Sequence, residues 1–159
     1  KVARRIKGRH SMSKNLLNNI IRKSIQNGYP IPGLIHDWKC GNLDSMKDLD
    51  VFDESELSYL KHTLPDEEQI SKTFLSESGE IKIPEEVFNC IKDAQEDGYT
   101  PDGACMDWYY GTCFDYDYDF AVEKWLNSLG NSETPKEQLI SQLYAQYILK
   151  NWGNKNVRK

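Results

Sequence analysis

Long apolar runs are missing from this chain. No stretch of about 18 apolar residues occurs, which is the length that a transmembrane helix requires. The basic N-terminus is not followed by the apolar segment of a secretory signal peptide. These two absences predict a cytoplasmic protein that does not enter a membrane.

Paired cysteines are also missing. Cys40, Cys90, Cys105 and Cys113 form no C-x-x-C motif, and nothing marks the chain as secreted, so free thiols are favoured over disulfides. A zinc site built from His36, Cys40, Cys105 and Cys113 is the alternative. Its spacings, H-x3-C and C-x7-C, match no standard ligand pattern. The sequence therefore predicts neither a metal nor a cofactor.

Lys and Arg are missing from the stretch Asp93–Glu123, although they are plentiful elsewhere. The same stretch holds nine acidic and eight aromatic residues. The whole chain has net charge −5, but residues 1–11 carry five Lys or Arg and no acid, so the rest carries −10. Residues 1–11 have two interpretations. They are a leader that is not part of the natural protein, which would then begin at Met12, or they are a native basic arm, which would indicate contact with nucleic acid.

The abundance of aromatic residues favours a folded chain over a disordered one. A length of 159 residues suits one domain with a real core. We expect residues 12–153 to form a single acidic globular domain, followed by a basic tail over 154–159.

Apolar residues recur at helical spacing in six places. They predict helices over 12–27, 54–63, 65–75, 84–97, 115–129 and 135–152, the second opened by a capping box at Asp53-x-x-Glu56. Pro30 and Pro32 predict turns in the segment 28–46, and Pro101, Gly103 and Gly111 predict an irregular segment over 99–114. Short strands are expected at 34–38 and 80–83, and the run 108–110 suits a strand or a packed loop. The predicted fold is α+β and mainly α-helical: one compact or elongated domain with five or six helices and a few short strands.

Alternating acids mark the segment from Asp115 to Glu123. A calcium loop would need Gly at its sixth position and Glu at its twelfth, whereas Phe120 is the sixth residue here and the acid comes ninth. A general acid/base pair cannot be selected from so many carboxylates. His36-Asp37 is the one histidine–acid pair of note, but no recognisable nucleophile accompanies it, so a packing or surface role is favoured.

These acids are best interpreted as an array. Proteins that bind DNA contact a regular line of phosphates, so a line of carboxylates fits the same basic channel, and aromatic residues anchor interfaces. The alternative is a solvated acidic face that only keeps the protein soluble. The candidate partner-binding residues are Asp107, Asp115, Tyr116, Asp117, Tyr118, Asp119 and Glu123.

Short motifs in the C-terminal third resemble those of the ArdA-type antirestriction proteins. They are Tyr110-Gly111, Asp119-Phe120-Ala121 opening a helix, and Tyr144-Ala145 in a last helix that ends at Trp152; His36-Asp37-Trp38 is a fainter echo. That family consists of small acidic proteins of plasmids, transposons and phages, regarded as DNA mimics that block type I restriction–modification enzymes. The resemblance implies the same activity for this chain.

The leading hypothesis is an acidic inhibitor from a phage or mobile element that binds a basic, nucleic-acid-handling defence enzyme. Catalysis and direct nucleic-acid binding are not expected, and a homodimer that lengthens the acidic face is an option. The alternatives are an immunity protein or antitoxin against a nuclease toxin, and a small enzyme that uses the acidic cluster.

Overall fold

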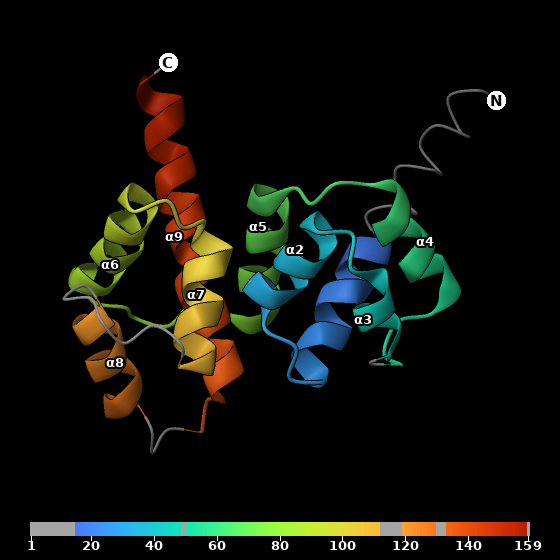
Figure 1. Ribbon diagram of the computed structural model, residues 1–159, viewed down its shortest axis with the longest axis horizontal. Coiled ribbons are helices and arrows are strands. Elements are labelled where there is room, and N and C mark those ends of the chain that lie inside the picture. Colours follow the sequence, from blue (N-terminus) through green and yellow to red (C-terminus); the bar gives the residue numbers. More distant parts are fainter. Residues whose placement is uncertain (1–14, 49, 112–118, 130–132, 159) are drawn as a thin grey trace.

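The computed structural model describes residues 15–48, 50–111, 119–129 and 133–158, and all regular secondary structure in these ranges is helical (Figure 1). The expected α+β fold is therefore wrong for this part of the chain, which contains no strand. A first helical segment covers 15–26 and is followed by α2 (Ile31–Lys39), α3 (Leu43–Asp48), α4 (Glu54–His62), α5 (Glu67–Ser78), α6 (Glu85–Glu96), α7 (Pro101–Tyr110), α8 (Asp119–Ser128) and α9 (Lys136–Arg158). This exceeds the five or six helices expected.

Helix α2 replaces the strand predicted at 34–38. Its buried residues Ile31, Leu34, Ile35 and Trp38 are spaced by three and four, which is the helical period. Pro32 lies in the first turn, where a fixed φ suits a helix and no N–H is needed. The prolines taken as turn formers are therefore part of a helix start.

Helix α7 replaces the irregular segment predicted around 99–114. Thr100 is its N-cap and accepts a hydrogen bond from the Gly103 N–H at 3.2 Å, and Pro101 follows as the first helical residue. Gly111 ends the helix in the left-handed conformation, with φ of 70°. Pro101 and Gly111 therefore lie at the start and the end of a helix and do not indicate irregular structure.

The segment predicted as a strand at 80–83 has no regular secondary structure and pairs with no strand in the described ranges. The N–H of Ile81 donates to Oε1 of Gln142 at 3.3 Å, and Nε2 of Gln146 donates to the Ile81 carbonyl at 2.8 Å. Two glutamine side chains of α9 thus supply the hydrogen bonds that a neighbouring strand would have supplied.

The remaining predicted helices are confirmed where they fall in the described ranges. Helix α4 begins with the expected capping box: Asp53 accepts from the Glu56 N–H at 2.9 Å, and Glu56 accepts from the Asp53 N–H at 2.8 Å. Helix α8 begins at Asp119, and residues 115–118 of the predicted helix lie outside the description. Helix α9 was expected to stop at Gly153 but continues to Arg158.

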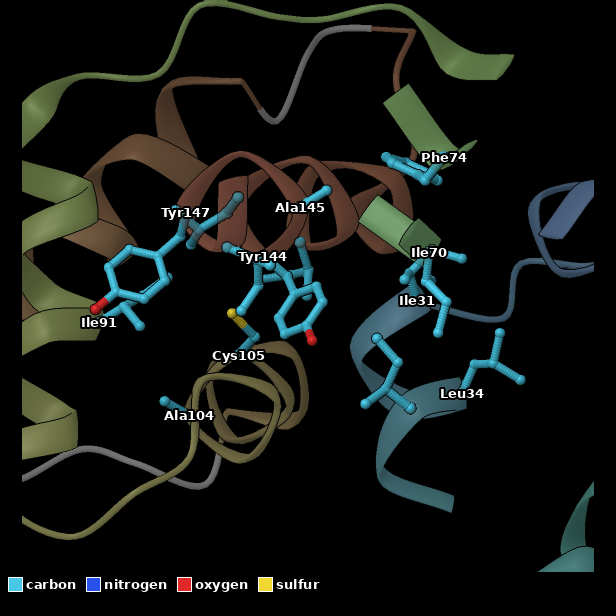
Figure 2. Close-up of a cluster of buried hydrophobic side chains, with 14 of the residues drawn as sticks. Ile31, Leu34, Ile70, Phe74, Ile91, Ala104, Cys105, Tyr144, Ala145 and Tyr147 are labelled. Atoms are coloured by element: carbon cyan, nitrogen blue, oxygen red, sulfur yellow. The ribbon is translucent and has the colours of Figure 1, made fainter. Parts of the chain in front are cut away.

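Helix α9 occupies the centre of the molecule, with α5, α7 and α2 packed against it (Figure 1). Residues 139–145 are all buried, so this helix has no solvent-facing side over two turns. Figure 2 shows Tyr144 and Ala145 among side chains from α2, α5 and α7. None of the helices in the described ranges is both long and apolar enough to span a bilayer.

Candidate functional site: the junction of α2 and α7

Helices α2 and α7 pack directly against each other. Gly33 lies at this contact, where a Cβ would be 3.0 Å from Cε at the end of the Met106 side chain. The missing side chain leaves room for Met106 between the helices. Side chains from α2 and α7 meet on both sides of this contact, in a polar network and in an open pocket.

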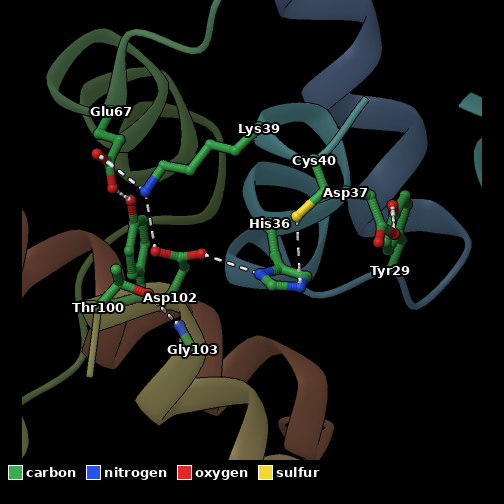
Figure 3. A network of polar contacts seen from close by, with 10 residues as sticks. Tyr29, His36, Asp37, Lys39, Cys40, Glu67, Thr100, Asp102 and Gly103 are labelled. Carbon is green, nitrogen blue, oxygen red and sulfur yellow. Dashed lines mark hydrogen bonds and ion pairs between the residues drawn. The ribbon is translucent and has the colours of Figure 1, made fainter. Parts of the chain in front are cut away.

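The polar network is centred on the carboxylate of Asp102, which is only 1% exposed. Lys39 Nζ donates to Asp102 Oδ1 at 3.0 Å and lies 3.4 Å from Oε2 of Glu67 (Figure 3). Tyr144 in turn donates its hydroxyl proton to Glu67. The network therefore links α2, α5, α7 and α9 through charge-assisted hydrogen bonds.

Electrostatics hold Lys39 in its charged form. Burial of its ammonium group lowers the pKa of Lys39. The hydrogen bond to Asp102 and the charge of Asp102, together with the smaller effects of Glu67, outweigh burial, so the pKa of Lys39 is raised overall. Burial, with the charge and hydrogen bond of Glu67, likewise raises the pKa of Tyr144. Both side chains thus keep their protons, as the hydrogen bonds that they donate require.

His36 connects this network to a thiol. Its Nδ1 lies 3.5 Å from Oδ2 of Asp102, and its Nε2 lies 3.8 Å from Sγ of Cys40 (Figure 3). Carboxylate, imidazole and thiol occur in the order that cysteine hydrolases use for nucleophilic catalysis. Asp37, the neighbour of His36 in sequence, instead accepts a hydrogen bond from the Tyr29 hydroxyl at 2.6 Å. The true carboxylate partner of His36 is therefore Asp102.

The other thiols differ from Cys40. Among the described residues, Cys40, Cys90 and Cys105 form no disulfide, and of these three only Cys40 is exposed. Burial, and then the charge of Asp102, raises the pKa of Cys105, which makes it a poor nucleophile. Cys113 lies outside the described residues. Among the residues that are described, no three His, Cys, Asp or Glu side chains gather as metal ligands.

A pocket of about 310 Å³ opens beside His36. It is lined by parts of α2, α7 and the segment before α2: Tyr29, Pro30, Gly33, His36, Asp37, Gly103, Met106, Asp107 and Tyr110. Among the described residues that line it, two are carboxylates, two are tyrosines and none is Lys or Arg. Burial, and then the hydrogen bond and charge of Asp37, raises the pKa of Tyr29, so the phenol stays neutral beside the carboxylate.

The structure separates the residues that the sequence grouped as one partner-binding array. Asp107 lines the α2–α7 pocket, whereas Glu123 lines a different hollow of about 340 Å³ with Trp108 and Lys136. Asp119 is the first residue of α8. The other predicted site residues, Asp115, Tyr116, Asp117 and Tyr118, lie outside the described residues.

Part of the charge in Asp93–Glu123 is compensated from elsewhere in the fold. Lys39 neutralises Asp102, to which it donates a hydrogen bond at 3.0 Å. Asp93, Glu96, Asp97 and Glu123 are exposed and form no salt bridge within the described ranges. The uncompensated acids are therefore fewer than the sequence suggested.

Sequence reasoning missed Lys39, Glu67 and Asp102 as members of one network. Their contacts join residues far apart in the chain, for which a single sequence carries no signal. The proximity of His36 and Cys40 could be predicted from the sequence, because residues four apart lie on the same face of a helix. The strand predicted over 34–38 hides this relationship.

No family model, curated protein or solved structure matches this chain. The antirestriction resemblance accordingly stays a prediction. Its motif residues have clear places in the fold: Tyr110 and Gly111 end α7, Phe120 is exposed on α8, and Tyr144 and Ala145 are core residues of α9.

Proposed function

We propose that this protein inhibits a basic, nucleic-acid-handling enzyme by covering the surface that nucleic acid would contact. A host restriction or other defence enzyme is the proposed target, and a phage or mobile element the proposed source. Inhibition is stoichiometric and needs no catalysis.

The observation that carries this proposal is the set of exposed acids without a salt bridge among the described residues. Asp93, Glu96 and Asp97 lie at the end of α6, and Glu123 lies on α8, which packs against α6 (Figure 1). Unpaired carboxylates project a negative field that accelerates encounter with a positive surface. Asp115, Asp117 and Asp119 extend the acidic sequence immediately before Glu123.

A restriction assay tests the inhibition. Cells that carry a type I restriction–modification system are challenged with unmodified phage, with and without the full chain. Relief of restriction is expected for the wild type, and reduced relief for a variant with Asp115→Asn, Asp117→Asn, Asp119→Asn and Glu123→Gln. The matched control removes four exposed acids elsewhere, at Asp44, Asp50, Glu54 and Glu80.

Capture from host lysate at low and high salt identifies the target. An enzyme that binds nucleic acid, is released by salt and is displaced by DNA is the expected result. Capture that is indifferent to both salt and DNA would contradict the proposal. A captured nuclease toxin would instead identify an immunity protein or antitoxin, because the same acidic chemistry serves both roles.

A second candidate function is favoured by one observation, the Cys40–His36–Asp102 order of thiol, imidazole and carboxylate. Such an arrangement supports a thiol-dependent enzyme. Against it, Cys40 caps the C-terminal end of α2, whereas activated thiols are commonly found at helix N-termini. Alkylation of Cys40 by iodoacetamide that slows markedly in His36→Ala would support the enzyme; unchanged alkylation would exclude the dyad.

A further inference from the structure

The methionines of this chain differ in how far solvent reaches them. Met46 of α3 is completely buried. Met106 of α7 is only partly buried, and its side chain lines the pocket of about 310 Å³ beside His36. The third methionine, Met12, lies outside the described residues. Of the two described methionines, Met106 is therefore the one that a small solute can reach from the pocket.

The thioether of Met106 rests against the backbone of α2. A Cβ placed on Gly33 would lie 3.0 Å from Cε and 3.3 Å from Sδ of Met106, and 3.5 Å from Cε1 of Tyr29. The sulfur and its methyl group thus occupy the space that a side chain at position 33 would otherwise fill. Contacts this short leave no room for another heavy atom between the sulfur and α2.

A thioether in this setting is open to one well-defined reaction. The sulfur lone pair attacks one oxygen of hydrogen peroxide, the O–O bond breaks, and a sulfur–oxygen bond forms. After proton transfer the other oxygen leaves as water, so the sulfur loses two electrons and the peroxide gains them. The product, methionine sulfoxide, is polar where the thioether was apolar, and sulfoxide reductases return it to the thioether.

We infer that Met106 is a site of reversible oxidation by peroxide, and that its sulfoxide loosens the packing of α7 on α2. The added oxygen has no space on the side of Gly33, so the side chain leaves this contact or pushes the two helices apart. The contact is one of those that hold α2 to α7, together with the ion pair between Lys39 and Asp102. The inference requires access and packing alone, and it is independent of the proposed inhibition.

Peroxide treatment of the full chain, followed by peptide mass mapping, tests the selectivity. The chain carries Cys40→Ser and Cys113→Ser, so that these two thiols do not react with the oxidant. Sulfoxide should form at Met106 about tenfold or more faster than at Met46, because oxidation follows exposure. Equal rates at the two methionines, or a faster reaction at Met46, would overturn the inference.

Thermal unfolding of the same samples tests the structural effect. Oxidation of Met106 should lower Tm by about 3 °C or more, and treatment with a methionine sulfoxide reductase should restore it. Met106→Leu keeps a similar volume without the sulfur, so peroxide should leave its Tm unchanged, whereas Met46→Leu should respond like the parent chain. An unchanged Tm after complete oxidation of Met106, or the same loss of Tm in Met106→Leu, would contradict the loosening of the two helices.

Discussion

Ser141 of the central helix α9 accepts a hydrogen bond from the backbone N–H of Ile31, at 2.8 Å between Oγ and N. Ile31 is the first residue of α2, and the N-cap Pro30 supplies no side-chain cap. The first N–H groups of a helix have no partner within the helix. A side chain 110 residues away in sequence therefore provides the missing acceptor.

Replacing Ser141 with Ala should lower the free energy of unfolding by about 1 to 3 kcal/mol, because the buried Ile31 N–H loses its acceptor. Ser24→Ala is the matched control. Both serines are buried and donate to the carbonyl four residues earlier, at 2.8 Å for Ser24 and 2.7 Å for Ser141. Urea denaturation measures both variants, and an equal loss in the two would contradict the capping role.

The pair Lys39–Asp102 gives a second stability prediction. Lys39→Met leaves the carboxylate of Asp102 buried, and among the described residues His36 is then its one remaining cationic neighbour, with Nδ1 at 3.5 Å from Oδ2. We expect a loss of about 2 to 3 kcal/mol, which is below the 3–5 kcal/mol of a fully buried pair because the Lys39 side chain is 34% exposed. Thermal and urea unfolding measure the loss.

A double variant tests whether the loss from Lys39→Met comes from the orphaned charge. Lys39→Met combined with Asp102→Leu should recover part of it, since no uncompensated carboxylate remains. Lys47→Met, on the exposed surface of α3, serves as the control for removing a lysine. If the double variant were less stable than Lys39→Met by the full cost of Asp102→Leu alone, the two residues would be uncoupled.

Two glycines with the same backbone angle differ in their surroundings. Gly28 and Gly41 both have φ of +69°, but a Cβ at Gly28 would lie 3.2 Å from Oε1 of Glu137, whereas Gly41 has nothing within 4 Å. Each substitution by Ala should cost about 1 kcal/mol for the left-handed conformation. Gly28→Ala should lower the free energy of unfolding more than Gly41→Ala, because only the first places a Cβ against Glu137. Urea denaturation of both variants measures the difference. Equal losses would mean that Glu137 moves aside freely.

Alkaline pH should destabilise the fold. The pKa values of Tyr29 and Tyr144 are raised in the folded state, chiefly by burial. In the unfolded chain a tyrosine ionises near pH 10, so the contribution of these protonated phenols is complete below about pH 10 and is lost as pH rises further.

Tyr144→Phe isolates one of these phenols. Above about pH 10 the stability of this variant should fall less steeply than that of the wild type, by up to about 1.4 kcal/mol per pH unit for the single proton. At neutral pH the variant should be less stable, because the hydrogen bond to Glu67 is lost. Urea unfolding over a pH series checks both effects, and parallel curves above pH 10 would contradict the assignment.

The helices that the sequence predicted well are those whose signals are local. The segment 15–26, α4, α5 and α6 each combine a one-sided apolar pattern with a clear start or stop. The sequence does not predict helices α2 and α7, because Pro32, Pro101 and Gly103 favour turns or irregular structure in the interior of a segment. In both helices proline lies in the first turn, where it is compatible with helical geometry.

The candidate site was predicted only in part. Asp107 lines the pocket, but its neighbours there, Asp37 and Tyr29, come from a part of the chain that was not connected with it. Asp102 belonged to the acidic stretch in the sequence, yet in the fold it is buried and paired with Lys39. Sequence composition counts charges, whereas burial and pairing decide which of them remain available to a partner.

By itself, the sequence determined the acidic balance of the chain, the helical segments with their capping box at Asp53 and Glu56, and the lack of a membrane-spanning run. These properties depend on composition and on residues three or four apart. Only the tertiary structure decided that Ile81 bonds to glutamines of α9, that Ser141 caps α2, and that His36 turns to Asp102 rather than to Asp37. The physical reason is that buried polar groups must find partners wherever packing places them, and packing joins residues that the sequence keeps far apart.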